Sequence, residues 1–187
     1  MIYIRHSEIN EKRKVYDWLC NSDVTPLMLG EHLGSDIPSF DDFEEDFEDF
    51  YFQEEKKNLG SLMIIQKDLE EIGCISYSTI LLNPNIAEID VWLKQLSLLG
   101  KGFGTKAIQL LLQYLNVHLK MNKFLIRPYI RNDRAIQAYQ KSGFKMIAGV
   151  ELDKILKEWY KPEISDEIRN GDYGKEFTAT LIREIPV

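Results

Sequence analysis

Three glycines at alternate positions, Gly100, Gly102 and Gly104, separate two segments of different periodicity. Before them, residues 86–94 alternate between apolar and polar side chains, which is typical of a strand. After them, residues 105–119 repeat apolar side chains every three or four positions, which predicts the longest helix of the chain. Glycine permits backbone conformations at such a turn that other residues avoid. A strand, a glycine-rich turn and a helix in this order favour an α/β or α+β fold.

The other segments supply the remaining elements of one domain over residues 1–187. Apolar patterns predict strands at 1–7, 61–66, 72–82, 124–130, 144–150 and 177–182, and helices at 10–20 and 133–141. Aromatic side chains spaced by three and four among acidic ones predict one helix within 36–55, with Ser39 as its N-cap. Residues 153–174 are polar and irregular, with a short helix at 155–160.

Composition narrows the class of partner. The chain carries 23 Lys and Arg against 30 Asp and Glu, a formal charge of −7, which disfavours a nucleic-acid-binding face and favours cationic partners. Two cysteines form no disulfide framework, and His and Cys lack metal-ligand spacing, so we expect no metal. Without a signal peptide or a long apolar run, the sequence predicts a cytoplasmic protein that does not bind membranes.

The glycine-rich turn has the chemistry of an anion site. Its backbone amides can point toward one place, and the N-terminus of the following helix adds a positive dipole end, which together suit a phosphate. The pattern is not a Walker loop, because Lys106 follows Thr105, and it is not the dinucleotide fingerprint, because one residue separates the last two glycines. Taken alone, it fits a tight turn equally well.

Two motifs together are more specific. Gly102 and Gly104 fall in register with the pyrophosphate loop of the Gcn5-related N-acetyltransferase (GNAT) superfamily, although Leu99 stands where Gln or Arg is usual. About 30 residues later, a second signature is matched at five positions: Asn132, Ala135, Tyr139, Gly143 and Phe144. Residues 60–150 therefore resemble that superfamily. The resemblance implies a single domain with a mixed, mostly antiparallel sheet of six to seven strands flanked by helices. It also implies that the sheet splays between strands 86–94 and 123–130.

The resemblance further implies an N-acetyltransferase that moves acetyl from acetyl-CoA to a primary amine of a small molecule by direct attack. Tyr139 would protonate the departing thiolate, although a helical Tyr is often only a core residue. Asn132 would contact the pantetheine arm and also suits a helix cap. The implied coenzyme-binding residues are Leu93, Lys94, Gln95, Leu99, Gly100, Lys101, Gly102, Phe103, Gly104, Thr105, Asn132, Ala135 and Tyr139.

Asp90 is the candidate general base. It lies on the strand 86–94 between apolar residues, where an ionised carboxylate is costly unless it has a partner. The local pattern resembles aminoglycoside 6'-N-acetyltransferases, which implies that Asp90 accepts the ammonium proton or anchors the acceptor; a structural salt bridge is the alternative. Glu88 is the reserve carboxylate on the same face. Trp92 either contacts the acceptor or fills the gap between sheet and helix.

One residue departs from that nearer likeness. Where those enzymes carry Asp before the Pro of the next strand, this chain has Arg127-Pro128. A positive charge at the acceptor site would repel a cationic sugar, unless Arg127 turns away and pairs with an acid. Residues 25–58 form either a solvated acidic face or a wall of the acceptor site, and 153–174 is a variable insertion. A protein or peptide N-acetyltransferase and an inactive CoA-binding module stay open, as do a monomer and a homodimer.

Overall fold

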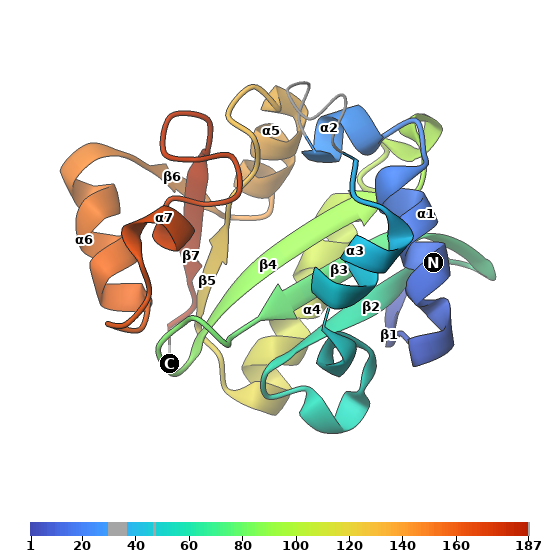
Figure 1. The fold of residues 1–187 in the computed structure, drawn as a ribbon, viewed down its shortest axis with the longest axis horizontal. Coiled ribbons are helices and arrows are strands. Elements are labelled where there is room, and N and C mark those ends of the chain that lie inside the picture. The colour runs from blue at the N-terminus through green and yellow to red at the C-terminus, as the bar shows by residue number, and fades with distance from the viewer. Residues whose placement is uncertain (30–36, 47, 187) are drawn as a thin grey trace.

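A single seven-stranded sheet forms the centre of the computed structural model, which describes residues 1–29, 37–46 and 48–186 (Figure 1). The strand order is β1-β2-β3-β4-β5-β7-β6, and every neighbouring pair is antiparallel except β4 and β5. The strands are β1 (Ile2–His6), β2 (Gly60–Lys67), β3 (Glu70–Ser78), β4 (Ile86–Leu93), β5 (Lys123–Ile126), β6 (Lys145–Ile147) and β7 (Thr180–Glu184). The expected mixed, mostly antiparallel sheet is confirmed.

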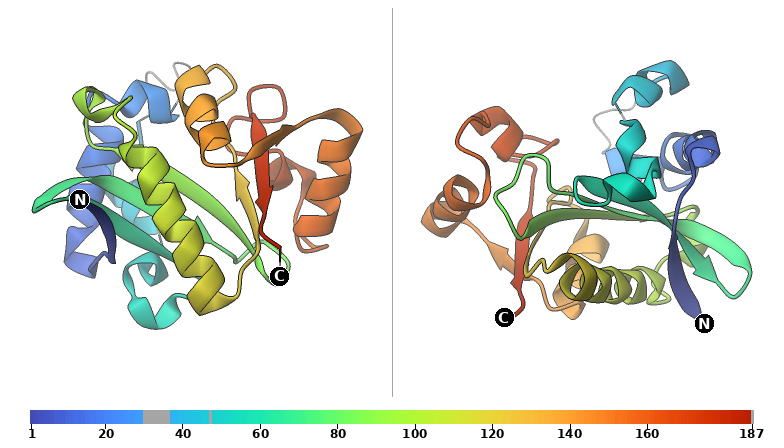
Figure 2. Two further views of the ribbon diagram at one scale, coloured as in Figure 1. Left: turned by 180° about the vertical axis from the view of Figure 1, so that it is seen from behind. Right: turned by 90° about the horizontal axis from the view of Figure 1, so that it is seen from below.

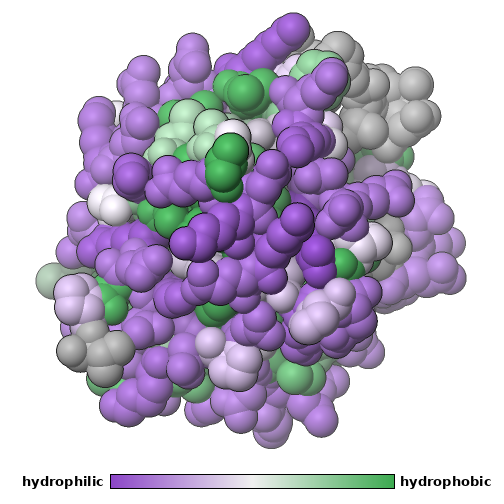
Figure 3. Space-filling model, turned by 90° about the vertical axis from the view of Figure 1, so that its left-hand side faces the viewer, coloured by the Kyte–Doolittle hydropathy of each residue, from purple (hydrophilic) through white to green (hydrophobic). Residues whose placement is uncertain are grey.

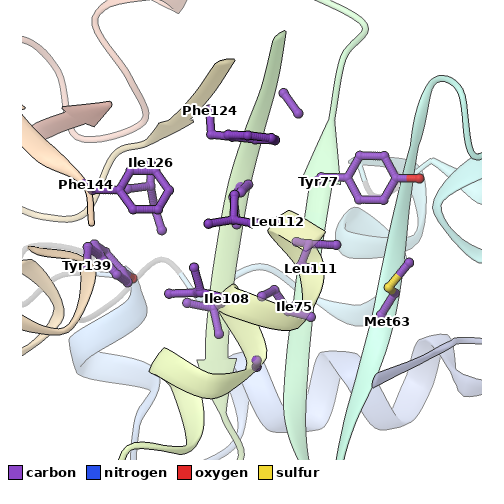
Figure 4. Close-up of a cluster of buried hydrophobic side chains, with 14 of the residues drawn as sticks. Met63, Ile75, Tyr77, Ile108, Leu111, Leu112, Phe124, Ile126, Tyr139 and Phe144 are labelled. Carbon is purple, nitrogen blue, oxygen red and sulfur yellow. The ribbon is translucent and has the colours of Figure 1, made fainter. Parts of the chain in front are cut away.

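Helices cover both faces of the sheet. Helices α1 (Lys12–Cys20) and α3 (Phe40–Asp46) lie on one face, and α4 (Phe103–Leu119) crosses the other (Figure 2). The main hydrophobic core lies between α4, α5 (Asp133–Lys141) and the sheet, where Ile108, Leu111 and Phe124 are fully buried (Figure 4). Removal of this apolar surface from water is the main stabilising contribution to the arrangement.

The sheet splays at its single parallel pair. Only three pairs of residues join β4 to β5, and the last of them is Glu88 with Leu125. Strand β4 continues to Leu93 with β3 as its sole partner strand among the described residues, so its other edge is open from Ile89 onward. The splay that the sequence resemblance implied therefore lies between these two strands, and Asp90 sits just beyond the last pair.

The acidic segment folds differently from the prediction. In place of one helix over 36–55, the chain forms α3 and two 3₁₀ helices, Asp49–Phe52 and Glu54–Lys56; Asp36 and Phe47 lie outside the described residues. Ser39 does cap α3, because its hydroxyl accepts from the Asp42 amide at 3.1 Å. Acidic side chains three and four positions apart repel along a continuous helix, which favours the break. Earlier in this region, α2 (Thr25–Leu29) forms a separate short helix.

The predicted strand 144–150 is also wrong in its second half. After β6, Gly149 adopts a left-handed conformation (φ 59°) at the start of α6 (Gly149–Trp159), which is longer than the short helix expected at 155–160. Leu156 and Trp159 of α6 pack with Leu82 in a separate cluster against the sheet. A second unexpected helix, α7 (Asp166–Arg169), follows within the supposed insertion.

The surface formed by these C-terminal elements is predominantly hydrophilic (Figure 3). Across the part of the chain that the structure describes, no helix is long and apolar enough to span a bilayer. The same residues contain no cluster of His, Cys, Asp and Glu that could hold a metal ion.

Candidate active site

The glycine-rich turn joins the end of β4 to α4 by way of a 3₁₀ helix, Leu96–Leu98. Gly100 and Gly102 both have positive φ angles, 74° and 80°, which explains why glycine is needed there. The helix begins at Phe103, and its first intrahelical amides have no carbonyl partner within the helix. The Gly102 carbonyl accepts from the Lys106 amide at 3.0 Å, which closes the first turn. A Cβ atom added at Gly100, Gly102 or Gly104 would meet nothing within 4 Å.

This open space belongs to a cavity of about 300 Å³ between the turn, β4 and α5. Ten of the thirteen residues implied for coenzyme binding line it: Leu93, Leu99, Gly100, Gly102, Phe103, Gly104, Thr105, Asn132, Ala135 and Tyr139. The other three, Lys94, Gln95 and Lys101, do not. Lys94 pairs with Glu70 at 3.1 Å, and Gln95 donates to the Ser97 hydroxyl at 2.8 Å.

Two basic residues at this cavity were missed in the sequence analysis. Arg134 and Lys141 both line it from α5, one near each end of that helix. They are seven positions apart, which places them on one helix face. Their spacing was visible in the sequence, but exposed basic residues on a helix are too common to mark a binding site by themselves.

Asn132 and Tyr139 lie where this cavity meets a second one, because both residues line both spaces. Asn132 caps α5, its side-chain oxygen accepting from the Ala135 amide at 3.1 Å. Tyr139 is buried (6 % exposed) beside Phe144 and Ile108 at the edge of the main core (Figure 4). Its hydroxyl makes no hydrogen bond to any described residue. Burial, together with the nearby Asp90, raises the pKa of this phenol and keeps it protonated.

The second cavity, of about 560 Å³, extends from the splay toward the C-terminal elements, and Asp90 lies on its wall. One Asp90 oxygen accepts from the Val91 amide at 2.9 Å. The carboxylate stays accessible to water within the cavity but is surrounded by protein atoms. Reduced hydration raises its pKa to about 7; the Val91 amide opposes this shift, and the carboxylates of Asp172 and Glu88 add to it. An acid that titrates near neutrality can act as a base at physiological pH.

Arg127 also lines this cavity, but its charge has a partner. Its Nε donates to Glu88 Oε1 at 2.5 Å and its Nη2 to Glu88 Oε2 at 3.0 Å, a bidentate ion pair whose arginine side chain is 8 % exposed. The Tyr160 hydroxyl donates to the same carboxylate at 3.1 Å. Arg127 and Glu88 thus both line the second cavity, yet each is already engaged with the other.

Trp92 lies on the same strand face as Asp90 but packs into a hydrophobic cluster with Val15 and Phe43. Its ring fills part of the space between the sheet and the helices, and the residue also lines the first cavity; a contact of Trp92 with an acceptor stays a prediction. Asp172, which the sequence analysis passed over as part of an insertion, lines the Asp90 cavity instead. No local pattern distinguishes it in the sequence.

Two curated proteins are similar to this chain over part of its sequence. The aminoglycoside N(6')-acetyltransferase type 1 of Klebsiella pneumoniae is 38 % identical over 63 residues, which span 34 % of this chain and 31 % of that protein. The kanamycin resistance protein of Rhizobium radiobacter is 38 % identical over 63 residues, 34 % of this chain and 58 % of that one. The matched stretch thus spans about a third to somewhat over half of these relatives.

Solved structures match over the whole chain. The aminoglycoside acetyltransferase AAC(6')-Ib in complex with ribostamycin and coenzyme A has a TM-score of 0.70 at 20 % identity, covering 98 % of this chain and 93 % of its own. Spermidine N-acetyltransferase from Vibrio cholerae, with CoA and spermine, has a TM-score of 0.67 at 18 % identity, covering 98 % and 95 %. The family described as acetyltransferase (GNAT) domain matches residues 2–145 of the 187, and the chain belongs to this family.

Proposed function

We propose that this protein is an acetyl-CoA-dependent N-acetyltransferase that transfers acetyl directly to a primary amine of a small molecule. One observation carries the proposal: the cavity at the glycine-rich turn and the cavity at Asp90 share Tyr139 in their linings. An acid kept protonated by burial thus lies where the two cavities meet, and it is near a carboxylate on the wall of the second cavity that titrates near neutrality. Direct transfer to an amine needs one group of each kind.

The lining of the first cavity, here called the coenzyme cavity, has the shape and the hydrogen-bond donors that a coenzyme A molecule needs. The space above Gly100, Gly102 and Gly104 would accept a pyrophosphate close to the backbone, and the first amides of α4 would donate to it. The open edge of β4 beyond Glu88 would receive the pantetheine arm, and backbone amides there would polarise a thioester carbonyl. Bound acetyl-CoA would supply the reactive thioester.

The second cavity, here called the acceptor cavity, contains the residues that would accept and donate protons. Asp90, ionised in about half of the molecules near pH 7, would accept a proton from the acceptor ammonium, directly or through a water. The amine would then have the lone pair needed for attack. Tyr139 would donate its proton to the leaving sulfur. A cavity of about 560 Å³ is within the usual size of small-molecule sites, which favours a small acceptor over a protein one.

Two measurements together test this proposal. Calorimetric titration with acetyl-CoA measures binding, and a thiol-release assay on a panel of alkyl amines, polyamines and amino sugars measures turnover. We expect micromolar binding and acceptor-dependent release of thiol with at least one small amine. Binding without acceptor-dependent release would identify a CoA-binding module, and release only with peptide amines would identify a protein acetyltransferase.

A further inference from the structure

A short segment of the chain closes one side of the acceptor cavity. This wall segment, residues 165–173, contains α7 and contributes Glu167, Ile168, Gly171, Asp172 and Tyr173 to the lining. It lies next to β5 and β7 (Figure 1). It belongs to the region that the sequence analysis treated as a variable insertion, so no role had been assigned to it.

Arg127 holds the first part of the wall segment. While Nε and Nη2 bind Glu88, Nη1 donates to the carbonyl oxygens of Ile168 and Arg169, both at 3.1 Å. These carbonyls lie at the C-terminal end of α7, where the Ile168 carbonyl also accepts from the Gly171 amide at 3.1 Å. The planar guanidinium therefore ties β4 and β5 to the wall segment through one side chain, a geometry that lysine cannot reproduce.

The second part of the wall segment has its own anchors. The Tyr173 hydroxyl donates to the Met28 carbonyl at the end of α2. Gly171 has φ 85°, and a Cβ there would lie 3.0 Å from Arg127 Nη1 and 2.9 Å from Thr178. The chain on both sides of Asp172 is thus fixed, which sets where its carboxylate stands.

Asp172 lines the cavity and is open to solvent, although protein atoms surround much of it. It makes no hydrogen bond or ion pair with any described residue. Burial raises its pKa, as does the Glu88 carboxylate, while Arg127 lowers it. Because Glu88 is neutralised by Arg127, the acids that line the cavity without an ion-pair partner among the described residues are Asp90, Glu167 and Asp172, and Asp172 is the one whose backbone is anchored on both sides. The unbonded hydroxyl of buried Tyr139 in the same cavity is an independent sign that a ligand completes the site.

We propose that Asp172 binds a second cationic group of the acceptor and that Arg127 is the positioning residue that holds the wall segment in place for this contact. The inference rests on the proposed function, since it assigns Asp90 to the amine that is acetylated. It predicts an acceptor with at least two ammonium groups. A single carboxylate at Asp172 gives such an acceptor a charge-assisted contact that a monoamine of equal length does not have.

Matched pairs of substrates test the proposal: n-alkylamines and α,ω-diamines of two to eight carbons, assayed by thiol release. For the best diamine, Asp172→Asn is expected to lower kcat/KM about 10- to 100-fold, mainly through KM. Measured at about pH 8.5, where Asp90 is ionised with or without the neighbouring Asp172 charge, the same variant should leave kcat/KM for the matched monoamine and the Kd for acetyl-CoA unchanged. Glu176→Gln removes the same charge from an exposed site outside the cavity and serves as the control.

The role of Arg127 is tested by the ratio of kcat/KM for the diamine to kcat/KM for the monoamine, which a change in stability alone would not alter. Arg127→Gln should lose the diamine preference, Arg127→Lys should recover it only in part, and Asp172→Asn combined with Arg127→Gln should lose no more than either single variant. If Arg127→Gln does not fold, Glu88→Gln with Arg127→Met replaces it, because that pair leaves no unpaired buried charge.

Equal losses for monoamines and diamines in Asp172→Asn, or a wild type without diamine preference, would overturn this inference while the acetyltransferase proposal stands. Binding of acetyl-CoA without thiol release for any amine would overturn the proposed function itself. The two failures are therefore distinguishable in one set of assays.

Discussion

Replacing Asp90 by Asn tests the central step of the proposed reaction. The change removes the proton acceptor while it keeps the shape of the side chain and the possibility of a bond from the Val91 amide. With a pKa of about 7, Asp90 is about one-tenth ionised at pH 6 and nine-tenths ionised at pH 8. The wild-type kcat/KM for an alkylamine should therefore rise about tenfold per pH unit below 7 and level off above it.

The variant should follow a different profile. Without the carboxylate, only the amine that is already neutral in solution can attack, and for an amine with a pKa of about 10.4 this fraction grows about 100-fold from pH 7 to 9. A positioned base contributes roughly 10²–10⁴-fold. A loss of about 10³-fold at pH 7 should thus shrink to about 20-fold at pH 9, because the wild type itself gains about twofold over that range.

Steady-state thiol release from pH 5.5 to 9.5 measures both profiles, with thermal melting to verify the fold and Glu176→Gln as a charge-matched control. The control should track the wild type at every pH. A loss that stays constant between pH 7 and 9 would refute the role of Asp90 as a base and identify it as an anchor for the acceptor.

Three further predictions address the coenzyme cavity, the acid and the stability of the fold. In Gly104→Ala, the new methyl group enters open space in the coenzyme cavity, so the Kd for acetyl-CoA should rise at least about tenfold in calorimetry without a lower Tm. The control, Gln109→Ala on the exposed face of α4, should bind acetyl-CoA normally. Wild-type affinity in the folded Gly104 variant would contradict the assignment. Tyr139→Phe should lower kcat about 10²-fold with unchanged acetyl-CoA affinity, and an unchanged kcat would leave Tyr139 as a core residue only. Asp90→Asn should melt at a higher temperature than the wild type at pH 8 but not at pH 4. The folded protein keeps the Asp90 proton up to about pH 7, whereas the unfolded chain loses it near pH 4. Asp90 therefore lowers the free energy of unfolding increasingly between these two pH values.

The elements nearest the site could be predicted because their signals are local. Helix α5 spans Asp133–Lys141 as predicted, since Asn132 caps it and Gly143 supplies the left-handed residue after its end. Helix α4 begins only two residues before its predicted start. The C-terminal region failed because apolar residues at 144–150 suit either a strand or a helix, and only tertiary packing of Trp159 against Leu82 decides between them.

The two cavities differ in how much of their lining could be predicted from local sequence patterns. The coenzyme cavity is lined mostly by the end of β4, the glycine-rich turn, α4 and α5, so glycine spacing and a capping residue are enough to locate most of its lining. The exceptions are Val24, Leu27 and Met28, which come from a distant part of the chain. The acceptor cavity depends on contacts between distant segments. Arg127 reaches Glu88 across 39 positions and Arg169 across 42, and no short-range pattern encodes such contacts. For that reason, no sequence pattern identified Asp172 as a residue of this cavity.

The same contacts change what the charge at position 127 means. If Arg127 had no ion-pair partner, it would repel a cationic acceptor by about 4 kcal/mol, the value for two unit charges 4 Å apart at an effective dielectric of 20. The bidentate bond to Glu88 cancels that charge where it would act, and it occupies the carboxylate that had been the reserve candidate for binding the acceptor. Asp90, Glu167 and Asp172 then leave the cavity with an excess of negative charge, so Arg127 at this position is compatible with an acceptor that carries several ammonium groups. Diamines and amino sugars are therefore the acceptors to assay before simple monoamines.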